Sequence, residues 1–402
     1  MSRPYDLILW GATGFTGQLV ARYLQQQYGD RLHWALAGRN EQKLNRVRAR
    51  INAPVLPLLT ADSHDRASLE ALAAETKVII STVGPYALHG SELVAACVAQ
   101  GTHYCDLTGE VQWMRRMIDQ HHAAAEAKGV KIVHTCGFDS IPSDMGVWFL
   151  QREAQRLHGQ PCVHIRYRLK GASGGFSGGT LASLNNVVTE SSQDPEVAQL
   201  LADPYALNPA GERQGPDGPD LQEGEYDAVA GAYVAPFVMA SINTRVVRRS
   251  HALQGYPYGK DFRYDEATIT GDGWWGKTAA WGISTGMNLV QQATPGSPLR
   301  WVMDTFLPKS GEGPSEKAQE NGYFKVYLFG SLPNGDIVRA TVTGDRDPGY
   351  GATSRMLAES AMCLAQDQLT TPSGVLTPSV AMGEALLTRL QTNAGLSFQV
   401  RE

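Results

Sequence analysis

The first 135 residues alternate short apolar runs with helix-like stretches, and this alternation constrains the fold more than any other feature of the chain. The apolar runs lie at 7–10, 34–37, 55–59, 78–80 and 130–133. Runs of this length separated by helical patterns are typical of βαβ units on a parallel sheet. A further strand is expected around 103–105. Pro57 either argues against a strand at 55–59 or places that strand at a sheet edge, because proline cannot donate to a strand ladder. The pattern predicts an α/β fold with a Rossmann-type parallel sheet.

The rest of the chain lacks this regular alternation. Its patterns predict a mixed set of elements: a helix near 143–157, a strand at 163–169, a long loop over 203–224, a hairpin around Asn334-Gly335, helices at 352–367 and 378–391, and a strand at 396–400. We therefore expect three parts: a Rossmann domain over 1–145, an α+β substrate domain over 146–345, and C-terminal helices over 346–402 that pack back on the Rossmann domain.

Charge and cysteine usage exclude several classes of protein. Thirty-five Lys and Arg residues against 40 Asp and Glu give a net charge of −5, so no basic field attracts nucleic acid. The five cysteines are scattered, which indicates neither a disulfide framework nor a zinc site. No secretory signal and no window of 18 uncharged apolar residues is evident. We expect a cytoplasmic protein that binds neither nucleic acid nor metal.

The strongest local signal is a glycine-rich segment between the first expected strand and the first expected helix. It reads Gly11-Ala12-Thr13-Gly14-Phe15-Thr16-Gly17. Glycines at such a turn let the backbone approach a pyrophosphate, whose charge is met by free N–H groups at the helix N-terminus. We expect this segment to bind a dinucleotide; the alternative is a glycine-rich turn without a ligand.

The end of the second expected strand favours NADP(H) over NAD(H). It reads Ala37-Gly38-Arg39-Asn40, with no carboxylate for a ribose 2′-hydroxyl, and Lys43 follows one turn later. A guanidinium can bind a 2′-phosphate through two hydrogen bonds. The alternative is that Arg39 is simply solvated at a helix start. Asp62, just past the third strand, is expected either to accept from the adenine amino group or to cap a turn or helix.

Residues after the fourth, fifth and sixth strands are candidates for the chemistry, since ligands of open α/β folds bind at the carboxyl edge of the sheet. Val83, Gly84 and Pro85 are expected to face the pyrophosphate and the nicotinamide ribose. The candidate acids are Tyr86, Tyr104, Asp106, His134 and Asp139. For each acid, a packing, capping or hydrogen-bonding role is the alternative.

Two segments of the second half suggest contacts with a substrate or a surface. A glycine-rich turn at 171–179 precedes a helical pattern with Thr180 as a candidate N-cap, where a carboxylate, thioester oxygen or phosphate could bind. Trp274, Trp275, Trp281 and Trp301 fall close together. They are expected to be core aromatics, the alternatives being the lining of an apolar substrate channel or a membrane interface.

Several motifs in order along the chain resemble those of the saccharopine dehydrogenase-like oxidoreductases, in the branch that includes the trans-acting enoyl reductases. They are Gly11 to Gly17, Ala37-Gly38-Arg39, Ser81 to Tyr86, Tyr104-Cys105-Asp106-Leu107-Thr108-Gly109-Glu110, Gly137-Phe138-Asp139-Ser140-Ile141-Pro142-Ser143-Asp144 and Pro348-Gly349-Tyr350-Gly351-Ala352-Thr353. The resemblance implies an N-terminal Rossmann domain that binds NADP(H), a second α+β domain over the nicotinamide, and a helical return. For the enoyl reductase branch it implies reduction of a carbon–carbon double bond in an acyl chain.

These observations give one leading hypothesis and two alternatives. The first is an NADP-dependent oxidoreductase that reduces a double bond of an acyl or lipid-like substrate. The second is an imine or amino-acid reductase of the saccharopine dehydrogenase type, and the third is a non-catalytic NADP-binding protein associated with lipid. The expected partner is a small acyl or amino-acid-like molecule, with a homodimer and peripheral membrane contact left open.

Overall fold

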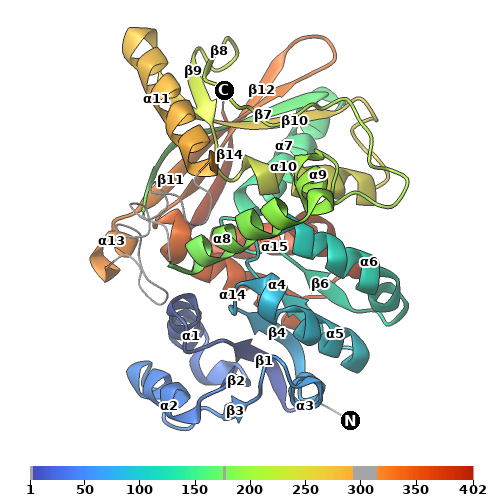
Figure 1. Ribbon diagram of the computed structural model, residues 1–402, viewed down its shortest axis with the longest axis vertical. Helices are drawn as coiled ribbons and strands as arrows, with labels where there is room; N and C mark the ends of the chain where they lie inside the picture. The colour runs from blue at the N-terminus through green and yellow to red at the C-terminus, as the bar shows by residue number, and fades with distance from the viewer. Residues whose placement is uncertain (1–2, 175–177, 293–314, 402) are drawn as a thin grey trace.

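The protein is built around two seven-stranded sheets. The computed structural model describes residues 3–174, 178–292 and 315–401. In Figure 1 the first sheet lies at the bottom and the second at the top, with α14 and α15 between them. The mixed α/β fold with a parallel Rossmann-type sheet is confirmed.

The first sheet is entirely parallel, in the order β13-β6-β5-β4-β1-β2-β3. Its strands are β1 (Tyr5–Trp10), β2 (Trp34–Gly38), β3 (Leu58–Thr60), β4 (Thr76–Ser81), β5 (His103–Cys105), β6 (Lys131–Val133) and β13 (Gly374–Leu376). The connecting helices are α1 (Phe15–Gln27), α2 (Glu41–Arg50), α3 (Arg66–Ala74), α4 (Tyr86–His89), α5 (Ser91–Gln100) and α6 (Val111–Ala127).

Helices cover both faces of this sheet, which explains the continuous apolar runs. Along β1, Leu7 and Leu9 belong to one buried cluster while Ile8 and Trp10 belong to another on the opposite face. The prediction of a strand at 55–59 is only partly confirmed, because β3 begins at Leu58 and Val55 is exposed. Its predicted place at the sheet edge is confirmed.

The second sheet is mixed, in the order β14-β12-β11-β7-β10-β9-β8. In the described part of the chain, β10 and β7 pair in parallel, and the other neighbouring strands of this sheet pair antiparallel. Its strands are β7 (His164–Ser173), β8 (Glu225–Asp227), β9 (Ala232–Pro236), β10 (Arg263–Gly271), β11 (Tyr323–Ser331), β12 (Ile337–Gly344) and β14 (Leu396–Arg401). The hairpin expected at Asn334-Gly335 joins β11 to β12.

The helices of this half are α7 (Ile141–His158), α8 (Gly178–Gln193), α9 (Pro195–Ala202), α10 (Ala240–Leu253), α11 (Gly273–Gln292), α13 (Glu316–Glu320), α14 (Thr353–Gln366) and α15 (Pro378–Thr392). Thr180 is not an N-cap, because α8 has already begun at Gly178. The expected turn at 171–179 is also shorter, since β7 continues through Ser173 by pairing with β11; residues 175–177 lie outside the described part of the chain, as does Trp301.

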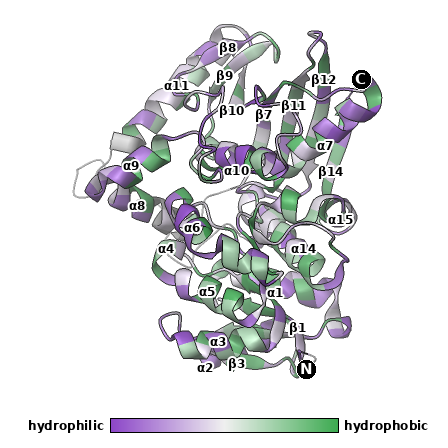
Figure 2. Ribbon diagram, turned by 90° about the vertical axis from the view of Figure 1, so that its right-hand side faces the viewer, coloured by the Kyte–Doolittle hydropathy of each residue, from purple (hydrophilic) through white to green (hydrophobic). Residues whose placement is uncertain are grey.

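The long loop at 203–224 is confirmed as a loop, and buried arginines of α10 hold it in place. Arg245 pairs with Asp220, and Arg248 Nε donates to Asp217 at 2.7 Å. Arg249 donates to the carbonyl oxygens of Leu207 and Val375, at 2.5 and 2.6 Å. Figure 2 shows the hydrophilic colour of α10 in the middle of the view, and most residues of this helix are buried. Ion pairs and carbonyls therefore replace water around these cations.

The C-terminal residues connect the two sheets. α14 packs against α1, β1 and β4, and β13 extends the first sheet, whereas β14 extends the second. The domain boundaries at 145 and 345 stay a prediction. Over residues 3–174, 178–292 and 315–401, no helix has the length and apolar character needed to cross a bilayer. The expected cytoplasmic location likewise stays a prediction.

Candidate functional site

The glycine-rich segment forms the turn from β1 into α1, and its glycines are sterically required. Gly11 has φ +86°, and a Cβ there would lie 2.6 Å from Val83 Cγ2. A Cβ on Gly17 would lie 2.2 Å from the carbonyl oxygen of Gly11. Gly14 is the N-cap of α1, where no side chain caps the helix and no acid occupies the first turn. Among the residues that the structure describes, no side chain accepts from the first N–H groups of α1, which are thus suited to an anion such as a pyrophosphate.

Polar residues follow β2 and β3 at the carboxyl edge of the first sheet, next to the glycine turn. Arg39 and Lys43 are exposed, and Asn40 caps α2 by accepting from the N–H of Lys43 at 2.9 Å. Asp62 Oδ1 accepts from the N–H of His64 at 2.9 Å, whereas Asp65 caps α3. The predicted turn role of Asp62 is therefore present, and its helix-capping alternative is wrong. An exposed guanidinium at the end of β2 fits a 2′-phosphate.

The segment after β4 is linked to the glycine turn and to the following helices. Thr82 Oγ1 lies 3.1 Å from the Gly11 carbonyl oxygen, to which it donates. The backbone N–H groups of Tyr86 and Ala87 donate to the Glu110 carboxylate at 2.7 and 2.9 Å. Ser183 of α8 donates to the same carboxylate at 2.9 Å. Glu110 therefore fixes the turn that holds Val83, Gly84 and Pro85, and connects it to the helix above.

Asp106 is the centre of a fully buried hydrogen-bond network between β5 and β6. Its Oδ2 accepts from the Tyr104 hydroxyl at 3.0 Å and lies 2.8 Å from His134 Nδ1, while its Oδ1 accepts from the N–H groups of Thr108 and Thr135. Tyr104 and Asp106 have no exposed surface. A carboxylate with four partners stabilises the ends of two strands. His134 Nε2 is buried beside it and has no hydrogen-bond partner among the described residues.

Tyr86 is buried in the same region, and its hydroxyl donates to the Ser81 carbonyl oxygen at 3.1 Å. Burial raises the pKa of Tyr86 well above its usual value, and the Asp106 charge adds to this effect. The same two causes raise the pKa of Tyr104. Both hydroxyls therefore stay protonated at neutral pH and donate to protein acceptors.

Asp139 is the candidate acid that remains partly exposed. Burial raises the pKa of its carboxyl to about 7, with a smaller contribution from the Asp106 charge. It lies in the turn between β6 and α7, where a Cβ on Gly137 would stand 2.6 Å from Asp139 Oδ2. The absence of a side chain at position 137 thus leaves room for this carboxyl. A carboxyl of this pKa can donate and recover a proton near neutral pH.

Two residues near the glycine turn were not among the candidates. Tyr350 packs edge-on against Phe15 with ring centroids 4.8 Å apart, and its buried hydroxyl has no partner among the described residues. Thr353 Oγ1 accepts from the N–H of Phe138 at 2.9 Å, in the turn that carries Asp139. Their only sequence signal was the Pro348 to Thr353 string, whose position beside the glycine turn depends on the return of the C-terminal segment.

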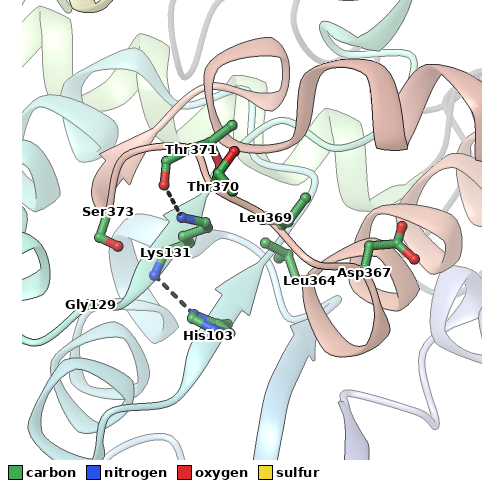
Figure 3. Close-up of a pocket in the computed structure, with 9 residues that line it drawn as sticks. All are labelled: His103, Gly129, Lys131, Leu364, Asp367, Leu369, Thr370, Thr371 and Ser373. Atoms are coloured by element: carbon green, nitrogen blue, oxygen red, sulfur yellow. Dashed lines mark hydrogen bonds between the residues drawn. The ribbon is translucent and has the colours of Figure 1, made fainter.

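A separate cavity of about 270 Å³ lies at the opposite, amino edge of the first sheet. Figure 3 shows it between the starts of β5 and β6 and the segment before β13. Lys131 Nζ donates to the carbonyl oxygens of Thr371 and Pro372, at 2.7 Å each, and the N–H of Lys131 donates to His103 Nδ1 at 3.0 Å. Burial lowers the pKa of His103 to about 4. These contacts join the C-terminal segment to the first sheet, away from the glycine turn.

The comparisons with known proteins agree with this geometry. Residues 7–133 match the family model of the saccharopine dehydrogenase NADP-binding domain. The chain is 42% identical over 415 residues to Rv2449c of Mycobacterium tuberculosis, which is named as a trans-acting enoyl reductase, covering 99% of this chain and 97% of the relative. It is 38% identical to the trans-acting enoyl reductase of Mycobacterium leprae, covering 96% of each.

The fold is also found among solved structures. Apo saccharopine dehydrogenase (L-Glu forming) from Saccharomyces cerevisiae superposes with a TM-score of 0.56 at 12% identity, covering 99% of this chain and all of that one. Fold and site together define an NADP-dependent oxidoreductase. The chain belongs to the saccharopine dehydrogenase-like family, alongside the mycobacterial proteins.

Proposed function

We propose that this enzyme reduces the carbon–carbon double bond of an acyl substrate. The observation that carries the proposal is the position of Asp139, a partly exposed residue in the turn between β6 and α7, at the edge where the glycine turn also lies; burial of its carboxyl raises the pKa to about 7. The names of the relatives support an enoyl substrate. Bound NADPH would supply the hydride.

The residues of the chain have distinct roles in this proposal. The α1 N-terminus, with Gly11, Thr13, Gly14, Phe15, Thr16 and Gly17, binds the pyrophosphate, and Arg39 and Lys43 bind the 2′-phosphate. Asp62 contacts the adenine, and Val83, Gly84 and Pro85 border the nicotinamide ribose. The hydride that NADPH supplies when bound would add to the alkene carbon remote from the carbonyl, and the Asp139 carboxyl would give its proton to the adjacent carbon. The products would be NADP⁺ and the saturated acyl chain, and the Asp139 carboxylate would recover a proton from water.

Tyr86, Tyr104 and Asp106 act through position rather than through proton transfer. The Tyr104 hydroxyl donates to Asp106, whose carboxylate also contacts His134 Nδ1. The Tyr86 hydroxyl donates to a backbone carbonyl oxygen at the end of β4. We therefore assign them to holding the ends of β4, β5 and β6 in register, so that Asp139 and the cofactor meet the substrate in a fixed geometry.

The proposal is tested by NADPH oxidation with a 2-enoyl thioester in the wild type and in Asp139→Asn. The expected kcat falls by about 100-fold or more in the variant, since a general acid is lost, while NADPH affinity is unchanged. Wild-type kcat should decline as pH rises through about 7, because the protonated carboxyl is the active form, and the variant should lack this decline. Asp6→Asn, at the opposite edge of the same sheet, is the matched control and should retain wild-type kcat.

Other outcomes select the alternatives. Wild-type kcat in Asp139→Asn would remove Asp139 as the proton donor. Turnover with a 2-oxo acid and an amine, without turnover of enoyl thioesters, would identify an imine reductase. NADPH binding without turnover of either substrate would identify a non-catalytic NADP-binding protein.

A further inference from the structure

The outward face of α11 is the largest concentration of exposed tryptophan in the described structure. Trp274, Trp275 and Trp281 are 66%, 78% and 71% exposed, and Leu289 of the same helix is 49% exposed. Trp274 and Trp275 contact each other edge to face with ring centroids 4.8 Å apart. Figure 1 shows α11 as an outer helix at the end of the molecule that holds the second sheet. The prediction that these three residues are core aromatics is therefore wrong, because they point away from the sheet.

The inner face of α11 already fixes the helix to the protein. Gly276, Ala280 and Ser284 are buried at four-residue spacing, and the helix packs against β9 and β10. A Cβ on Gly276 would stand 2.3 Å from the Gly271 carbonyl oxygen, so this contact is close. Among the described residues, the packing of α11 therefore leaves the tryptophan face exposed.

A groove of small residues runs along the outward face beside the tryptophans. Gly282 and Gly286 are exposed, and a Cβ on either would meet no atom within 4 Å. Ala279, one turn earlier, is also exposed. Glycines four residues apart on an open helix face permit close approach of another helix backbone. The groove and the exposed tryptophans are two separate observations: the glycine spacing indicates a helix as the occupant, and the tryptophans indicate that its surface is apolar.

The charge of α11 favours a protein surface over a membrane. Across residues 273–292 the only charged side chain is Lys277, whereas helices that bind membranes in the interface plane are rich in Lys and Arg. The chain as a whole carries −5, so anionic lipid offers no long-range attraction. Two copies of α11, in contrast, can pack against each other with little electrostatic repulsion, because each carries one charged side chain.

We propose that α11 is the interface of a homodimer, in which the tryptophan face and glycine groove of one copy pack on those of a second copy. The three exposed tryptophans present on the order of 500 Å², more than half of the roughly 800 Å² that each partner buries in a standard interface. A two-fold interface requires one patch that is complementary to itself. α11 meets this requirement because it carries both protruding rings and an open groove.

The test measures the dimer dissociation constant of the full chain by sedimentation or light scattering across a concentration series. The wild type should dimerise in the micromolar range or tighter, and Gly282→Leu/Gly286→Leu should weaken the dimer at least tenfold by filling the groove. Trp275→Ser/Trp281→Ser should weaken it at least as much. Val55→Ser, which removes an exposed apolar side chain far from α11, is the control and should leave the dimer intact.

The glycine variants separate a dimer from a membrane-binding helix. Leucine extends the apolar face and is a better helix former than glycine, so membrane binding would be kept or strengthened where dimerisation is lost. A wild type that stays monomeric at 100 µM would overturn the proposal. A dimer whose dissociation constant is unchanged in both double variants would also overturn it. The same holds if no dimer forms and binding to phosphatidylcholine vesicles increases in the glycine variant. NADPH affinity serves as the folding control and should be the same in every variant.

Discussion

The two sheets of this enzyme were assembled from the chain in different ways. In the first sheet, β1 to β6 come from consecutive βα units within residues 5–133, and neighbouring strands pair in parallel. In the second sheet, β7 at residue 164 lies beside β11 at residue 323, and β12 lies beside β14 at the end of the chain. Local patterning therefore suffices for the first sheet, whereas the second depends on contacts between distant segments.

The polar groups buried in the two regions differ in the same way. Around the first sheet, Asp106 accepts from Thr108 and Tyr104, which lie two residues away, and it also pairs with His134 of the adjacent strand end. In the second region, Arg248 of α10 reaches Asp217, and Glu266 accepts from Asn243 at 2.9 Å. The first arrangement holds together strand ends at the carboxyl edge of the first sheet, whereas the second mainly joins loops and strands of the second half.

The largest expected effect is that of Gly14→Asp, which changes the glycine turn of the first sheet. Position 14 is an N-cap with ordinary φ, so aspartate should cap α1 and preserve the fold. Its carboxylate would occupy the N–H groups of the helix and repel a pyrophosphate, weakening NADPH binding by about 4 kcal/mol, or roughly 1,000-fold. Isothermal titration measures the affinity and thermal unfolding measures the fold, with Gly14→Ala as the control. Undiminished binding in Gly14→Asp would show that the glycine turn is not the pyrophosphate site.

Asp106→Asn should lower the free energy of unfolding by about 3 kcal/mol. The amide cannot accept from all four partners, which leaves buried donors unsatisfied. Urea unfolding monitored by fluorescence measures the effect. Unchanged stability together with lost turnover would contradict the positioning role and make Asp106 a participant in the chemistry.

Arg39→Ala sharpens the assignment of the cofactor. We expect NADPH affinity to fall by about 2 kcal/mol, roughly 30-fold, because a hydrogen bond between charged groups is lost. Weak NADH binding should not change. Arg46→Ala, at another exposed position of α2, is the matched control. An equal loss for both nucleotides in Arg39→Ala would contradict recognition of the 2′-phosphate.

The smallest expected effect concerns Glu266 in the second sheet. Burial raises the pKa of this carboxyl to about 7, above its usual 4.5, so folding favours the protonated form. Its contribution to stability is present below about pH 4.5 and is lost as pH rises toward 7. Between about pH 5 and pH 6.5, the free energy of unfolding of Glu266→Gln should therefore fall by about 1–2 kcal/mol less than that of the wild type. Parallel pH profiles for the two proteins would contradict this account.

Local chemistry explains which parts could be predicted. The glycine turn, the strand ends that carry Arg39 and Asp106, and the β11–β12 hairpin all depend on neighbouring residues. The pairing of Tyr350 with Phe15 could not be predicted, because it requires the chain to return after more than 300 residues. Periodicity also could not show which face of α11 would be covered, so Trp275 was expected in the core and is exposed.

Transfer of deuterium from 4-deuterated NADPH to a 2-enoyl thioester tests the central claim most directly. The proposed reaction predicts a saturated thioester with one deuterium on the carbon remote from the carbonyl and one solvent hydrogen on the adjacent carbon, both assigned by mass spectrometry and NMR. Recovery of the deuterium in a secondary amine formed from a 2-oxo acid and an amine, with none in the thioester, would contradict the claim.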